Sequence, residues 1–251
     1  MRGEDGSRWI KRRRRYKDVP HISPRVPYET SHGHLGHFRG LVALSSYTAV
    51  IGIFGHRHTS MDDIVLRAMT KWPNVPAVFG WLSLDRRGRW LLRGERIGNR
   101  AANEFISRNY GHDEEQRWYF QNGPQRVFVT LSYTPWVLVL DADEQLRTHT
   151  ELTVSTLTHC WIDDDMHMLL ETEHGVGLVH DHDLSPLTDA FHDSNGTKLD
   201  DDETQARLES LAAGAPSTLS LCWGGHSVPV SFIAAGDVPR RFGFDPEPSA
   251  P

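Results

Sequence analysis

Cysteine is scarce in this sequence, and a long hydrophobic run is absent. Only Cys160 and Cys222 occur among the 251 residues, which excludes a disulfide-rich scaffold and a four-cysteine zinc module. The most apolar stretch, residues 40–55, is interrupted by serine and threonine. It is also shorter than the roughly 20 residues that a membrane-spanning helix needs. We therefore expect a cytoplasmic protein with no membrane segment.

Signatures of common catalytic classes are also missing. The sequence has no Gly-Xaa-Ser-Xaa-Gly nucleophile elbow, no phosphate-binding loop and no Gly-Xaa-Gly-Xaa-Xaa-Gly after an expected strand. Both cysteines lie within apolar, strand-like runs, where a thiol is more typical of a core position than of a nucleophile. The sequence therefore assigns no catalytic residue and no cofactor.

Charged residues are distributed unevenly. Residues 85–126 contain nine Lys or Arg and six Asp or Glu, whereas residues 127–251 contain five and 21. An acidic body repels polyanions over about 8 Å at physiological salt. The net charge of −6 therefore disfavours nucleic acid and anionic membranes as partners. The eight tryptophans and 38% hydrophobic residues indicate a folded core.

Residues 1–60 differ from the rest of the chain. They contain 11 Lys or Arg and four Asp or Glu, include the run Arg12–Arg15, and show no sustained periodicity. This stretch fits a leader upstream of a true start at Met61, a disordered arm or a functional basic tail. Asp62 and Asp63 favour the start at Met61, because acidic residues stabilise the first turn of a helix.

From Met61 onward the pattern predicts an α+β protein. Helical spacing of apolar residues predicts a helix over 61–72, which ends before Pro73 because a residue preceding proline avoids the helical region. Asn99 is the expected cap of a second helix that ends by Tyr110, and a third is expected at about 203–213. Alternating apolar residues between turn sequences predict strands at 77–84, 89–92, 117–121, 125–132, 136–140, 153–162, 166–171, 175–180, 218–223 and 227–233.

These elements group into two small β-rich modules with short helices. We expect the first module over 61–150, with two helices, and the second over 151–236, with one or two. Residues 1–60 form the leader or disordered basic segment, and residues 237–251, which are rich in proline, are expected to be a flexible tail.

Three motifs carry a resemblance to a known family. The first is Gly80-Trp81-Leu82 followed by residues 84–90, and the second is Ser107-Arg108-Asn109-Tyr110. The third, residues 118–127, reads Trp-Tyr-Phe-Gln-Asn-Gly-Pro-Gln-Arg-Val. Together they resemble a family of uncharacterised proteins found mainly in proteobacteria. The resemblance runs from about Met61 to Leu187 and implies no assigned activity.

A second resemblance is more distant. The hairpin from Leu84-Asp85 to Gly88-Arg89-Trp90, followed by Gly94, Ile97 and a helix, is similar to another uncharacterised bacterial family. The fold of that family is a tandem pair of small β pseudo-barrels with short helices. The resemblance therefore implies that the two β-rich modules are pseudo-barrels.

The turn from Gln121 to Arg126 is the strongest candidate for recognition. Its amides and guanidinium lie beside aromatic residues, a combination that suits a small polar ligand or a peptide. The same residues also fit plain turn formation. The predicted ligand-binding residues are Arg93, Arg96, Trp118, Gln121, Asn122, Gly123, Gln125 and Arg126.

A second candidate is the sequence His180-Asp181-His182-Asp183. If these residues lie on a strand, His180 and His182 share one face and Asp183 follows at the loop. Imidazole and carboxylate ligands suit zinc, iron or manganese. A solvated, polar strand end is the alternative interpretation of the same residues.

Three functional hypotheses follow from these residues. The leading one is a soluble module, without catalysis, that binds an unknown small ligand or protein through the turn at Gln121–Arg126. The alternative is a metal-dependent enzyme built on His180, His182 and Asp183. The third is a single-stranded nucleic-acid binder whose basic and aromatic surface comprises Arg87, Arg89, Trp90, Arg93, Arg96, Trp118, Tyr119 and Arg126.

Overall fold

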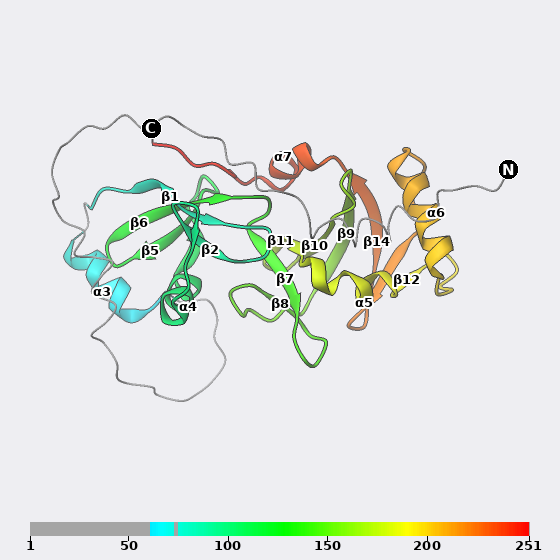
Figure 1. The fold of residues 1–251 in the computed structure, drawn as a ribbon, viewed down its shortest axis with the longest axis horizontal. Helices are drawn as coiled ribbons and strands as arrows, with labels where there is room; N and C mark the ends of the chain where they lie inside the picture. Colours follow the sequence, from blue (N-terminus) through cyan, green and yellow to red (C-terminus); the bar gives the residue numbers. More distant parts are fainter. Residues whose placement is uncertain (1–60, 73–74, 251) are drawn as a thin grey trace. The chain divides into compact units, whose positions relative to one another are not determined.

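A computed structural model of the protein describes residues 61–72 and 75–250. The expectations for residues 1–60, including the leader, lie outside this range. The described residues form two β-sheets and five short α-helices (Figure 1). The expected α+β class, with two small β-rich modules and short helices, is confirmed.

The first sheet has six strands in the order β3-β2-β1-β6-β5-β4. Helix α3 (Asp63–Lys71) precedes it, and α4 (Arg100–Arg108) connects β3 to β4. Asn99 caps α4 as expected, because its side chain accepts a hydrogen bond from the backbone N–H of Ala102. The strands are β1 (Val78–Leu84), β2 (Trp90–Leu92), β3 (Glu95–Arg96), β4 (Tyr110–His112), β5 (Trp118–Asn122) and β6 (Gln125–Leu131).

The second sheet has eight strands in the order β12-β13-β14-β9-β10-β11-β7-β8. Its helices are α5 (Leu184–Thr188) and α6 (Asp201–Ala212), and α6 begins at a capping box formed by Asp200 and Glu203. The strands are β7 (Trp136–Leu140), β8 (Leu146–Thr148), β9 (Leu157–Asp163), β10 (Met168–Thr172), β11 (Gly175–Val179), β12 (Phe191–His192), β13 (Ser220–Trp223) and β14 (His226–Ile233).

The chain passes from the first sheet to the second between β6 and β7. Strand β7 pairs with β11 and β8 pairs with β7, so residues 136–148 belong to the second sheet. The sheets therefore divide near residues 132–135, upstream of the expected module boundary at 150. Aromatic side chains fill the junction: Trp118 lies 5.0 Å from Trp136 and 4.9 Å from Tyr110, measured between ring centroids.

The C-terminal segment is not the flexible tail that we expected. A short 3-10 turn, Ala235–Asp237, leads into α7 (Val238–Phe242), and Val238 and Phe244 are buried. The backbone N–H of Leu131 in β6 donates to the carbonyl of Pro246 at 2.8 Å. The chain thus leaves the second sheet and ends against the first, held by packing and a strand hydrogen bond.

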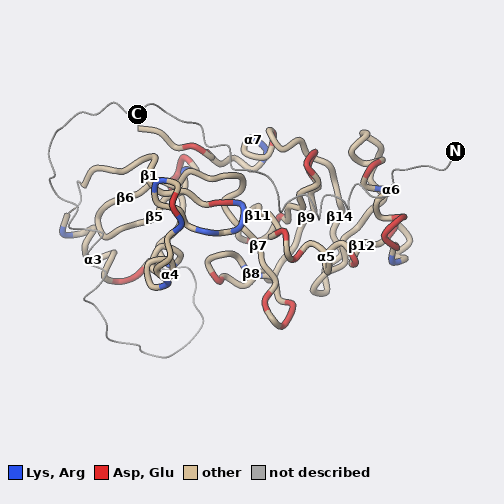
Figure 2. The backbone as a smooth tube through the Cα atoms, viewed as in Figure 1, with Lys and Arg blue, Asp and Glu red and all other residues tan. Residues whose placement is uncertain are grey.

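Lys and Arg lie mostly on the first sheet, whereas Asp and Glu are frequent in the loops of the second (Figure 2). No helix in the described part of the chain is both long and apolar enough to cross a membrane.

Candidate functional site

The turn between β5 and β6 is a two-residue loop. Asn122 pairs with Gln125, so Gly123 and Pro124 form the loop, and Gly123 has a positive φ of 57°. A type II′ turn needs φ above zero at its first central residue, and proline fixes φ near −65° at the second. The expected turn between the strands at 117–121 and 125–132 is therefore formed, with Gly123 and Pro124 as its two central residues.

Helix α3 and the segment before β1 lie against this hairpin. A Cβ placed on Gly123 would be 3.8 Å from the Cβ of Ala68, and the Gln125 amide donates to the carbonyl of Pro76 at 3.1 Å. Val65 of α3, like Tyr119 and Phe128, is buried but does not belong to the main core cluster. Helix α3 thus lies beside the β5–β6 hairpin, at the end of the first sheet farthest from the second sheet (Figure 1).

A cavity of about 340 Å³ lies between α3 and the hairpin. It is lined by Met69, Trp72, Val75, Ala77, Gln121, Pro124 and Arg126. Its volume is at the lower end of the range of about 300–1,000 Å³ that small-molecule sites occupy. We call it the hairpin pocket.

Gln121 is wholly buried at this pocket. Its Nε2 donates to the carbonyl of Gly123 at 2.8 Å, while its Oε1 has no hydrogen-bond partner. The bond to a carbonyl fixes the amide orientation, because only the nitrogen can donate. An acceptor left unpaired in this way costs about 1–3 kcal/mol, so this oxygen keeps an unused capacity to accept a hydrogen bond.

Arg126 and Trp72 supply the exposed part of the pocket wall. The Arg126 guanidinium lies 4.8 Å from the Tyr119 ring centroid, and no ion pair in the described range involves this arginine. Asp113, the carboxylate that its charge influences, is bound by Arg117 at 2.7 Å. Trp72 is 52% exposed. A cation and an indole are therefore open to solvent beside the buried amide.

Three predicted binding residues lie elsewhere. Arg93 stacks on Trp81 at 3.9 Å, and Arg96 is on the edge strand β3, separated from β5 by three strands. Trp118 lies in the core on the opposite face from Gln121, because residues three apart on a strand point to opposite sides. The structure thus brings together Gln121, Asn122, Gly123, Gln125 and Arg126, but not the other three.

The residues of the metal hypothesis do not form a ligand set. Strand β11 ends at Val179, and His180 caps a 3-10 turn over Asp181–Asp183 rather than continuing the strand. The His180 Nδ1 accepts from the His182 N–H at 3.2 Å, and the Asp183 carboxylate accepts from the Leu140 N–H at 3.1 Å. Because residues 181–183 form this turn, the condition under which both histidines would share a strand face is not met. Within residues 61–72 and 75–250, no group of three or more His, Cys, Asp or Glu side chains is placed to hold a metal ion.

The surface of the nucleic-acid hypothesis is partly occupied by other contacts. Trp90 and Trp118 are buried. Arg87 pairs with Asp181 at 2.7 Å, and Arg89 pairs with Asp85 at 2.6 Å. Tryptophans in the core and paired arginines do not present the exposed aromatic rings and free cations that single strands require.

A larger cavity, of about 620 Å³, lies on the second sheet. Its imidazoles bond to backbone carbonyls: His192 donates to Ala190 at 2.9 Å and His226 to Ser155 at 3.0 Å. None of the buried unpartnered side-chain atoms of the described residues belongs to its lining. This second cavity therefore lacks the open acceptor that marks the hairpin pocket.

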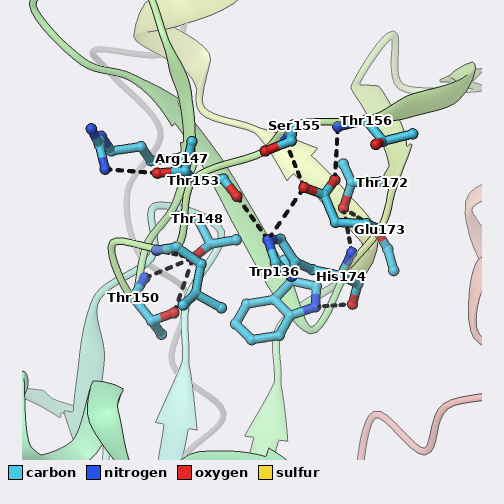
Figure 3. Close-up of polar contacts among 12 residues, drawn as sticks. Trp136, Arg147, Thr148, Thr150, Thr153, Ser155, Thr156, Thr172, Glu173 and His174 are labelled. Atoms are coloured by element: carbon cyan, nitrogen blue, oxygen red, sulfur yellow. Dashed lines mark hydrogen bonds and ion pairs between the residues drawn. The ribbon is translucent and has the colours of Figure 1, made fainter. Parts of the chain in front are cut away.

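One wall of the larger cavity is fixed by a polar network around Glu173 (Figure 3). The Glu173 carboxylate accepts from the backbone N–H groups of Ser155 at 2.6 Å and Thr156 at 3.0 Å, and His174 donates to the carbonyl of Thr153 at 2.9 Å. Burial raises the pKa of Glu173, but the backbone N–H groups outweigh it and hold that pKa below its usual value. The network ties the 153–156 loop to the β10–β11 turn, which is a structural task.

A buried carboxylate, Asp163, fixes the turn between β9 and β10. It accepts from the Tyr133 hydroxyl at 2.6 Å, from His167 Nδ1 at 2.9 Å, and from the N–H groups of Asp165 and His167 at 2.9 and 2.8 Å. Burial raises the pKa of Asp163, but the bonds from His167 and Tyr133 outweigh it and lower that pKa. Every bond here holds the turn or joins it to the chain before β7.

His149 lies in the aromatic junction between the sheets. Its Nδ1 accepts from the Val137 N–H at 3.3 Å, and its Nε2 is buried without a hydrogen-bond partner. Ring centroids of Trp90, Tyr110 and Trp136 lie 5.3 to 5.8 Å away. Burial lowers the pKa of His149 to about 3, so this imidazole is neutral at physiological pH.

Sequence reasoning missed the half of the hairpin pocket that comes from outside the hairpin. Met69 and Trp72 belong to the end of α3 and the residue after it, and Val75 and Ala77 precede β1. The available signal was the number of apolar residues in the segment 61–72, which is larger than one packed helix face requires. In the structure Ile64, Leu66 and Trp72 remain exposed, and exposed apolar side chains that cluster can mark a binding surface.

Comparisons with known proteins agree with the sequence resemblance. A family model described as "Protein of unknown function (DUF2946)" matches residues 61–249, which confirms the resemblance to an uncharacterised family and extends it beyond Leu187. No curated protein matches the chain.

Two solved structures are similar to the chain. A DUF1285 family protein from Silicibacter pomeroyi DSS-3 is 14% identical with a TM-score of 0.44, covering 70% of this chain and 90% of its own. A DUF1285 family protein from Shewanella baltica OS155 is 16% identical with a TM-score of 0.32, covering 41% and 85%.

Proposed function

We propose a function for a chain that belongs to the family described as proteins of unknown function (DUF2946): it is a cytoplasmic binding module whose ligand enters the hairpin pocket. The observation that carries the proposal is Gln121, a residue that lines this pocket and whose buried side-chain oxygen has no hydrogen-bond partner. Both cysteines are unpaired, which fits a reducing compartment.

The pocket has the parts that small-molecule sites share. Such sites are mostly apolar, with a few fixed polar groups that orient the ligand. Met69, Val75 and Pro124 give apolar walls, and Gln121 and Arg126 give an acceptor and a cation. None of the lining residues is a nucleophile or a carboxylate, so the chemistry supports binding rather than a reaction.

A thermal-shift screen of the full chain tests the proposal. The compounds are small carboxylates, amides, amino acids and short peptides. A ligand at about 100 times its dissociation constant adds roughly 2.7 kcal/mol. For this size of protein, that raises the melting temperature by about 5–11 °C.

Two matched variants locate the site. Gln121→Met removes the free oxygen of the hairpin pocket, and Gln145→Met makes the same change at the larger cavity. We expect a stabilising compound whose effect is lost in Gln121→Met and kept in Gln145→Met. A compound lost only in Gln145→Met, or no stabilising compound at all, would contradict the proposal.

A further inference from the structure

The two polar groups of the hairpin pocket lie on the same face of the hairpin. Gln121 and Arg126 are direct cross-strand partners in the register of β5 and β6. Side chains of opposite residues point to one face, with Cβ atoms about 4.5–5.5 Å apart. The acceptor and the cation are therefore within reach of one small ligand.

The Gln121 amide and the Arg126 guanidinium require different hydrogen-bonding groups on the ligand. The Gln121 nitrogen is already bound to the Gly123 carbonyl, so the amide offers the ligand only an acceptor and selects an N–H or O–H donor. The guanidinium of Arg126 is stacked on Tyr119, which leaves its N–H edge for an acceptor. A carboxylate fits that edge through two parallel hydrogen bonds.

The remaining walls select an apolar group. Met69 and Pro124 line the pocket, and the Trp72 indole stands at its rim with the Lys71 ammonium 4.6 Å from the ring centroid. A second positive charge near the rim favours an anionic ligand and disfavours an amine. A bare phosphate offers no apolar surface for these walls, and an ionised phosphate oxygen next to Gln121 Oε1 is repelled.

From these three requirements we propose that the hairpin pocket binds an N-acyl amino-acid unit with a free α-carboxylate and an apolar side chain; this rests on the proposed function. The acyl N–H donates to Gln121 Oε1, the carboxylate binds Arg126, and the side chain packs on Met69, Trp72 and Pro124. One carbon separates the amide nitrogen from the carboxylate carbon in this unit. The unit occurs in free acylated amino acids and at the carboxyl end of peptides and proteins.

The experiment is a calorimetric titration of the full chain with three matched probes. N-acetyl-leucine carries both groups, N-acetyl-leucinamide lacks the negative charge, and 4-methylpentanoate lacks the N–H. Hydrogen bonds to charged groups contribute about 1.5–3 kcal/mol, which is about tenfold or more in affinity. We expect N-acetyl-leucine to bind at least about tenfold more tightly than N-acetyl-leucinamide, and about two- to tenfold more tightly than 4-methylpentanoate, whose missing N–H would form a neutral hydrogen bond. N-acetyl-methionine and N-acetyl-phenylalanine repeat the test with other apolar side chains.

Variants assign each contact. Arg126→Gln changes an exposed side chain and is expected to weaken N-acetyl-leucine by about tenfold or more while leaving N-acetyl-leucinamide unchanged. Gln121→Met is expected to weaken both. Equal loss of both probes in Arg126→Gln would overturn the assignment of the carboxylate.

Two further arms separate the outcomes. A pentapeptide ending in leucine is compared with its C-terminal amide: tighter binding of the free acid than of N-acetyl-leucine indicates a protein end, and weaker binding indicates a small molecule. If none of the three N-acetyl acids binds while another compound shows a shift that depends on Gln121, the ligand class is wrong and the binding function stands. If no compound depends on Gln121, both fail.

Discussion

Gln121 on the first sheet and Asp163 on the second are both wholly buried polar side chains, but their surroundings differ. Asp163 accepts four hydrogen bonds from Tyr133, Asp165 and His167. Gln121 donates one and keeps a free oxygen beside a cavity. A buried group whose partners are all internal stabilises the fold, whereas one that lacks a partner costs stability and has a capacity left for a ligand.

His149 is an intermediate case. Like Gln121 it has a buried unpartnered atom, Nε2, but its neighbours are the rings of Trp90, Tyr110 and Trp136. An N–H against an aromatic face is a weak interaction that a ligand does not need to replace. Absence of a partner therefore points to a site only where the surroundings also leave room.

The largest expected effect is acid destabilisation through His149. Its pKa is about 3 in the folded state and about 6.5 when unfolded. Between about pH 6.5 and about pH 3 this histidine is protonated in the unfolded chain but not in the folded one. The free energy of unfolding therefore falls by about 1.4 kcal/mol per pH unit as pH decreases. The total is about 4–5 kcal/mol, and nothing is lost through this group above about pH 6.5. Urea unfolding from pH 7 to pH 4 measures the part of this loss that falls above pH 4, about 3–4 kcal/mol.

The control is His149→Asn, which keeps an acceptor for the Val137 N–H and cannot take up a proton in this range. Its stability at pH 7 is lower because it leaves a void among the rings. Its pH dependence between 7 and 4 is expected to be shallower than that of the unmodified protein by about one proton. Parallel curves would mean that the imidazole is accessible to protons in the folded state.

The next largest effect concerns Asp163, the buried group whose hydrogen-bond partners are all internal. Asp163→Asn places an amide NH₂ where Tyr133 and His167 donate, and the expected loss is about 2–4 kcal/mol. Asp164→Asn is the control, because its exposed oxygen accepts one bond, from the Ala235 N–H, which an amide oxygen also accepts. We expect the control within about 0.5 kcal/mol, measured by urea unfolding at pH 7. Equal losses would show that the four bonds to Asp163 add little.

Local structure could be predicted from sequence because its causes are local. Asn99 caps α4 with its own side chain, and the glycine after Asn122 fixes the hairpin through its positive φ. The end of β11 was missed because it depends on a distant strand. The Leu140 N–H of β7 donates a hydrogen bond to the Asp183 carboxylate. No sequence pattern within residues 175–183 indicates that partner.

The candidate site could be predicted only in part, for the same reason. Gln121 and Arg126 are cross-strand partners within one hairpin, so the local sequence pattern was sufficient to predict that they lie together. Arg93 and Arg96 were expected there, but strand order separates them from β5. The far wall comes from Met69 and Trp72, about fifty residues earlier, and it is placed by tertiary packing of α3, which periodicity does not determine.

The smallest expected change in stability concerns Gln121, the buried group whose oxygen has no hydrogen-bond partner. Gln121→Met keeps the length of the side chain, removes the unpartnered oxygen and loses one bond to the Gly123 carbonyl. The two effects oppose each other, so the free energy of unfolding is expected to change by less than about 1 kcal/mol. Urea unfolding without ligand measures it, and Gln145→Met, on an exposed side chain, is the reference. A loss of about 2–4 kcal/mol, as expected for Asp163→Asn, would mean that the Gln121 oxygen has a structural partner in solution. The distinction between a saturated and an open buried group would then fail at the residue on which the binding proposal rests.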